Sequence, residues 1–166
     1  MKSLPQQYLT ALAERLAADG CEVHWENWDS ASVLIGHRAD FRVQWMMSRL
    51  HLYTVAAAFP EVTKATVGQF ALSARSYAGA HKPGLPSGFQ TGAAVFACLV
   101  SDYVQPEALD YAASEQGLGS GVFARPVVVD TDRRAVAAFR RTGFMGALFG
   151  PYLRRKITLY FDGTVL

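Results

Sequence analysis

The sequence has little cysteine and no long apolar run, and each shortage excludes a class of protein. Two cysteines, Cys21 and Cys98, are too few for a disulfide framework and too far apart for a zinc site with closely spaced ligands, so we expect buried free thiols. No apolar run approaches the roughly 20 residues that span a bilayer, and polar residues interrupt the first segment where a signal peptide needs a continuous apolar stretch. We therefore expect a cytoplasmic protein without a membrane span.

Excess charge of one sign is also missing. Lys and Arg total 16 against 14 Asp and Glu, for a net charge of +2, so no strong field demands a nucleic-acid partner. The C-terminal third is locally basic, which keeps nucleic-acid binding open. A hydrophobic content of 51% in 166 residues predicts one globular domain, 1–166.

Two common catalytic motifs are absent. The glycine-rich stretch "GLPSGFQTG" at 84–92 lacks the Lys-Ser/Thr that closes a P-loop, and an apolar strand rather than a helix follows it, so we interpret it as a turn. Gln90 and Thr91 within it are candidates for lining a cleft. No serine stands in a G-x-S-x-G context, so a hydrolase triad is unsupported.

Apolar periodicity and turn residues predict the secondary structure. In chain order, we expect a helix at 5–19, a strand at 21–26, a hairpin of strands at 33–47 and 50–59 that reverses at Ser48 and Arg49, a helix at 61–79, a buried strand at 93–100, a helix at 106–116, a hairpin of 122–130 with 135–141, a short helix at 144–156 kinked by Pro151, and a final strand at 157–161.

This order predicts an α/β (α+β) fold with a central mixed sheet flanked by helices. The core is α-β-β-β-α-β over about 5–115, and a β-rich extension with a hairpin and a short helix follows over about 118–166. Pro126 favours an edge position for its strand, because proline lacks the N–H that a central strand donates.

The segments "CEVHW", "GHRADFRVQW", "LHLYTVA" and "AVFACLVSDYVQPEALDYA", in this arrangement of elements, resemble the restriction-endonuclease-like, or PD-(D/E)XK, superfamily. The segments "GFQTG" and "RRTGFMGALFGPYLRRK" resemble small prokaryotic proteins. The superfamily resemblance implies a Mg²⁺ site built from an Asp on strand two and a Glu-x-Lys on strand three. Asp40 matches the first position, and Glu14 matches an acid that some members carry on the first helix.

Strand three departs from that pattern. It offers Thr54 followed by Val and three alanines, 56–58, where Glu-x-Lys is expected, and a methyl group cannot bind Mg²⁺. Either the site is degenerate, or it has migrated so that Asp40, Glu61 and Lys64 are catalytic and Mg²⁺ is held by Asp40 and Glu61 with Glu14. The simpler interpretation of Glu61 and Lys64 is a solvated pair one helical turn apart.

Two other groups of residues are candidates. His37 lies three residues before Asp40, so it is a candidate to share a pocket with that residue; the simpler interpretation is a surface histidine on a strand. The C-terminal aromatic and basic segment is expected to pack on the core or to form a homodimer contact; its candidate interface residues are Phe144, Phe149, Tyr152, Arg154 and Arg155.

Three functions remain open from the sequence. The first is a catalytically inactive scaffold that acts as a binding or assembly module and needs no cofactor. The second is a Mg²⁺-dependent nuclease with a migrated site. The third is a regulatory protein that binds a partner through its C-terminal aromatic and basic segment.

Overall fold

The computed structural model describes residues 1–42, 45, 48–81, 91–114, 122–141 and 149–163. Within them the chain forms four helices and six strands, which are, in chain order, α1 (Leu4–Ala18), β1 (Glu22–Trp28), β2 (Ala31–Arg42), β3 (Ser48–Ala58), α2 (Lys64–His81), β4 (Thr91–Ser101), α3 (Pro106–Ala113), β5 (Val122–Asp130), β6 (Ala135–Ala138) and α4 (Gly150–Phe161).

The six strands form one mixed sheet in sequence order, β1 to β6. The first three strands are antiparallel, β3, β4 and β5 are parallel, and β6 returns antiparallel to β5. The crossover from β3 to β4 contains α2, and the crossover from β4 to β5 contains α3, as parallel pairs require. The predicted fold class and the order of the first six elements are confirmed.

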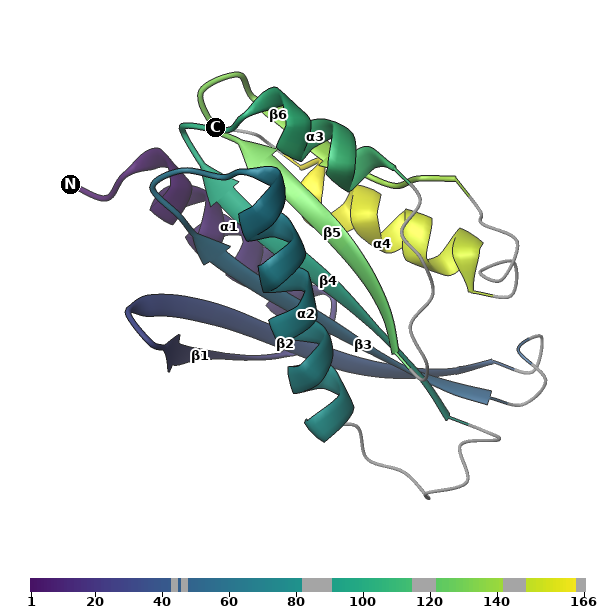
Figure 1. Cartoon of the computed structure of the whole chain (residues 1–166). Coiled ribbons are helices and arrows are strands. Elements are labelled where there is room, and N and C mark those ends of the chain that lie inside the picture. The colour runs from purple at the N-terminus through teal and green to yellow at the C-terminus, as the bar shows by residue number, and fades with distance from the viewer. Residues whose placement is uncertain (43–44, 46–47, 82–90, 115–121, 142–148, 164–166) are drawn as a thin grey trace.

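Helices cover both faces of the sheet (Figure 1), α1 and α4 on one face and α2 and α3 on the other. Alternating residues of β4 enter the two cores: Phe96 and Cys98 face α1 and α4, whereas Val95 and Leu99 face α2 and α3. All four are at most 1% exposed, which explains why this strand is apolar without alternation.

Local signals set the bounds of the first helix. Ser3 caps α1, and its side chain and that of Gln6 bond each other's backbone N–H groups in a capping box. Pro5 sits in the first turn, where its missing N–H has no intrahelical role. The helix ends before Gly20, whose φ of 83° lies in the left-handed region that glycine adopts without strain.

The C-terminal prediction was wrong, because 157–161 is the second half of α4 and not a strand. Pro151 occupies the first turn and begins the helix rather than kinking it. Leu153, Ile157 and Tyr160 recur at helical spacing and are buried, while Leu159 is 49% exposed. Five residues with every second one apolar fit either period, so a short run does not distinguish them.

Two further details differ from the prediction. Ser48 and Arg49, the expected reversal, are the first residues of β3, and Ser48 pairs with Arg42 at the end of β2. Pro126 does not mark an edge strand, since β5 lies between β4 and β6. It stands one residue before β6 begins to pair at Val127, a place where no β6 carbonyl needs its missing N–H.

No described helix has the length and the apolar character that crossing a membrane requires.

Candidate functional site

Asp40, the candidate metal ligand, is already bound by side chains of this chain. Arg38 donates from Nε to Oδ2 of Asp40 over 2.8 Å and from Nη2 to Oδ1 over 2.7 Å. The hydroxyl of Tyr152, on α4, also donates to Oδ2. Burial alone raises the pKa of Asp40, but the bonds from Arg38 and Tyr152 outweigh burial and hold that pKa below its usual value.

This contact belongs to a larger ionic cluster that ties α4 to α1 and β2. Asp19, at the end of α1, pairs with Arg38 (Nη1 to Oδ2, 2.7 Å) and Lys156 (Nζ to Oδ2, 2.7 Å), and it accepts a bond of 2.5 Å from the hydroxyl of Tyr160. We call this set the Asp19–Asp40 cluster; its members are Asp19, Arg38, Asp40, Tyr152, Lys156 and Tyr160. Burial raises the pKa of Tyr160, and the bond to Asp19 raises it further, so the hydroxyl stays a donor. The cluster therefore holds α4 against α1 and β2.

The other predicted ligands do not join Asp40. In the β2–β3 register Asp40 lies opposite Leu50, whereas Glu61 follows the far end of β3 at Ala58. Eight residues of strand separate these two levels, or about 26 Å at about 3.3 Å per residue. The migrated Asp40–Glu61 site is therefore not formed, because the antiparallel register sends the two carboxylates to opposite ends of the sheet.

Glu61, Lys64 and Glu14 are exposed, each at a different place. Glu61 accepts a bond of 2.8 Å from Nε2 of Gln105, and Nζ of Lys64 lies 5.7 Å from the ring centroid of Tyr111. Glu14 lies on α1. Among the described residues, no three His, Cys, Asp or Glu side chains gather closely enough to hold a metal ion.

The strand-three positions of the superfamily motif are used by the core. Thr54 is 1% exposed and Ala56 0%, and Leu52 and Ala56 belong to the core under α1 and α4. A polar ligand at these positions would be buried among apolar side chains, at the cost that burial imposes on an unpaired charge.

His37 does not share a pocket with Asp40, because odd and even residues of β2 point to opposite faces. Its Nε2 lies 3.0 Å from Nδ1 of His51, and its ring stacks on Tyr53 at 4.6 Å, all on the face of α2. Burial lowers the pKa of His37. Thr91 begins β4 opposite Arg49; Gln90 lies outside the described residues.

The predicted C-terminal interface is mostly internal. Tyr152 is buried, and Phe149 packs edge-on against Trp45 with ring centroids 5.2 Å apart. Only Arg154 and Arg155 of the described candidates are exposed; Phe144 lies outside the described residues. The aromatic part of this segment completes the core of its own chain.

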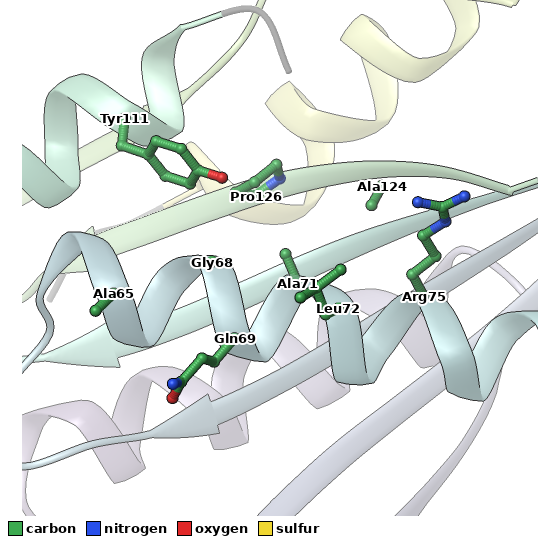
Figure 2. A pocket seen from close by; sticks show the side chains of 9 residues that line it. All are labelled: Ala65, Gly68, Gln69, Ala71, Leu72, Arg75, Tyr111, Ala124 and Pro126. Atoms are coloured by element: carbon green, nitrogen blue, oxygen red, sulfur yellow. The ribbon is translucent and has the colours of Figure 1, made fainter. Parts of the chain in front are cut away.

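The sequence analysis missed a groove between α2 and α3, whose base includes β5 (Figure 2). Its volume is about 520 Å³, within the range of ligand sites in proteins. We call it the α2–α3 groove; it is lined by Ala65, Gly68, Gln69, Ala71, Leu72, Arg75, Tyr111, Ala124 and Pro126.

Small side chains create this space. Ala65, Gly68 and Ala71 bring almost no volume to the α2 wall, and a Cβ built on Gly68 meets nothing closer than the Tyr111 hydroxyl at 3.8 Å. Figure 2 shows Tyr111 reaching over from α3, and Arg75 marking the other end of the groove on α2. Leu72 is 63% exposed. The sequence signal for the groove is a leucine that stands among small residues on a helix; that this leucine is exposed is seen only in the structure.

No family model, no curated protein and no solved structure matches the chain.

Proposed function

We propose that this chain is a non-catalytic binding module, and that it holds an apolar, acidic segment of another polypeptide in the α2–α3 groove. The α-β-β-β-α-β order similar to the restriction-endonuclease-like superfamily is, in this proposal, a scaffold without the chemistry. The observation that carries the proposal is the contrast between an occupied Asp40 and an open groove on the other face of the sheet.

The state of Asp40 supports the absence of catalysis. Both of its carboxylate oxygens accept bonds from Arg38, and Tyr152 adds a third bond. A Mg²⁺ ion would have to displace these donors, and the buried strand-three positions Thr54 and Ala56 offer no acid. Asp19, the acid of the same cluster, is itself paired with Arg38 and Lys156. The carboxylate stabilises the fold in place of a metal.

The lining of the groove supports the chemistry of the ligand. Most of the nine lining residues are apolar, and Arg75 is the only one of them with a formal charge. An apolar group against Leu72 and Ala71, followed by a carboxylate on the side of Arg75, matches this apolar lining and its one positive charge. The open groove between two helices admits an extended chain, and the exposed Leu72 adds apolar area at its rim.

Binding is tested with short synthetic peptides that carry a leucine followed by an acidic, a neutral or a basic residue. Amide chemical shifts of the isotope-labelled protein are recorded during titration. We expect the acidic peptide to shift residues of α2, α3 and β5, and to bind at least about tenfold more tightly than the basic one, the equivalent of about 1.4 kcal/mol.

Two variants localise the binding. Gly68→Leu places a side chain in the groove and is expected to abolish the shifts, while leucine favours the helix over glycine and preserves the fold. Leu159→Ala removes an exposed leucine from α4 on the opposite face and should leave binding unchanged. Equal binding by wild type and Gly68→Leu would contradict the proposed site.

The absence of catalysis has its own test. The protein is incubated with Mg²⁺ or Mn²⁺ and single- or double-stranded DNA or RNA, and we expect no cleavage. Cleavage that disappears in Asp40→Ala would overturn the proposal in favour of a nuclease.

A further inference from the structure

The two edges of the sheet differ in how readily they could pair with a further strand. β1 forms the first edge, and no described segment pairs with its outer side. It has seven residues and contains no lysine, arginine or proline, so its only charged residues are Glu22 and Glu26. β6, at the other edge, has only four residues, and arginines stand on both sides of it in the sequence, at 133–134 and 140–141.

The sequence of β1, "EVHWENW", is complementary to itself when two copies run antiparallel. If Trp25 of one copy lies opposite Trp25 of the second, all seven residues are paired. In this register His24 faces Glu26 of the second copy, and Glu26 faces its His24. The two side chains already touch within one strand, with Nε2 of His24 2.9 Å from Oε1 of Glu26. In the pair, the two His24 and the two Glu26 side chains would therefore form one group of four, in which each imidazole has a carboxylate on either side.

We propose that β1 is the contact through which two copies of this chain associate, by antiparallel pairing centred on Trp25, into a continuous sheet of twice six strands. Neighbouring registers are worse. Centring the pair on His24 places Glu22 opposite Glu26, and centring it on Glu26 places two Glu26 side chains face to face.

Burial across the strand agrees with this partner. Trp25 is 46% exposed, which is unusual for tryptophan, and the self-pairing register brings two such rings together on the face of α1. On the other face His24 and Glu26 keep 52% and 32% of their side-chain area exposed. Glu26 remains an anion, because bonds from Trp28 and His24 hold its pKa below the usual value.

This surface is independent of the α2–α3 groove. β1 and β5 are separated by three strands of the sheet, and none of the residues that line the groove belongs to β1. β1 touches α2 through Phe70 and Tyr77, but neither of these rings lines the groove, so different variants test association through β1 and binding in the groove.

The test is the mass of the protein in solution, measured by sedimentation velocity over a concentration series. The wild type is expected to be dimeric. His24→Glu sets a new carboxylate against Glu26 of the second copy, twice across the two-fold axis, and is expected to raise the dissociation constant at least about tenfold. A monomeric wild type at the highest concentration would overturn the proposal.

Charge complementation identifies the register. Glu26→Lys alone should also weaken the dimer, since the new ammonium group then faces His24 of the second copy in place of a carboxylate. An equimolar mixture of His24→Glu and Glu26→Lys should recover the dimer as a heterodimer, because the introduced carboxylate and the introduced ammonium group then face each other.

Arg154→Glu is the matched control, an exposed change on α4 in the segment expected from the sequence to form the interface. It should leave the dissociation constant unchanged. A dimer that His24→Glu leaves intact, or that Arg154→Glu dissociates, would place the contact elsewhere.

Discussion

The two faces of the sheet are closed in different ways. Large aromatic rings fill the core on the face of α1 and α4, where Phe96 of β4 contacts Tyr160 and Phe161 with ring centroids 6.4 and 5.7 Å away. The Asp19–Asp40 cluster also ties α4 to α1 and β2 on this face. On the other face α2 places its rings, Phe70 and Tyr77, against Trp28 of β1. Where α2 and α3 approach each other they contribute alanine, with Ala74 of α2 and Ala108 of α3 fully buried.

This difference accounts for the α2–α3 groove. Large side chains from α1, α4 and the sheet fill the core on the first face. Alanine and glycine let α2 and α3 sit on the sheet without filling the space between them, and the α2–α3 groove remains. The position that resembles a nuclease site lies on the filled face, and the open site lies on the face that the superfamily motif did not indicate.

The largest expected effect compares adjacent residues of β4. Phe96→Ala, on the filled face, should lower the free energy of unfolding by about 4 kcal/mol, because it removes a fully buried ring and leaves a cavity. Val95→Ala, on the other face, should cost about 2 kcal/mol, since two carbons are lost. Urea unfolding curves measure both; equal costs would contradict the contrast between the faces.

A smaller effect is expected in the Asp19–Asp40 cluster. Arg38→Met leaves Asp19 and Asp40 without their shared cation, and should cost about 2 kcal/mol at neutral pH. This is less than the about 3 to 5 kcal/mol of a fully buried pair, because the three side chains are only partly buried and Lys156 stays beside Asp19. Arg154→Met, on the exposed side of α4, should change stability by less than about 0.5 kcal/mol.

The pH dependence of Arg38→Met follows from the carboxylates. The folded-state pKa values of Asp19 and Asp40 lie below the usual 3.8, so the unfolded chain takes up protons first as the pH falls. The stabilisation is present above pH 3.8 and is lost as the pH falls through the lowered values. The difference between wild type and Arg38→Met should therefore shrink in acid; a difference that stays constant would show that the cation is not the cause.

Local signals in the sequence predicted most of the fold. The periodicity of α1, the alternation of β1 and the continuous apolar run of β4 each have one solution, and the structure confirms them. The sequence could not decide α4, because the five residues from Ile157 satisfy both periods and only contacts with α1 and β4 choose between them.

The candidate site was beyond the sequence for a different reason. Asp40 and Tyr152 are 112 residues apart, so the sequence around Asp40 does not indicate that its carboxylate accepts a hydrogen bond from Tyr152. The groove depends on the distance between two helices, and no pattern within either helix encodes that distance. The proposed pairing of β1 with a second copy is the opposite case, because seven consecutive residues contain all of its complementarity.

The smallest expected effect is a difference in stability between two glycine-to-alanine substitutions, one on each face of the sheet. A Cβ on Gly36 of β2 would stand 2.9 Å from Cδ1 of Leu16, a fully buried side chain that would have to shift, so Gly36→Ala should cost about 1 to 2 kcal/mol. A Cβ on Gly68 meets only the Tyr111 hydroxyl, at an ordinary contact distance of 3.8 Å, so Gly68→Ala should gain up to about 1 kcal/mol from helix propensity. Thermal unfolding gives both signs. If Gly68→Ala also destabilises, the space beside α2 is filled, and the two faces of the sheet are packed alike.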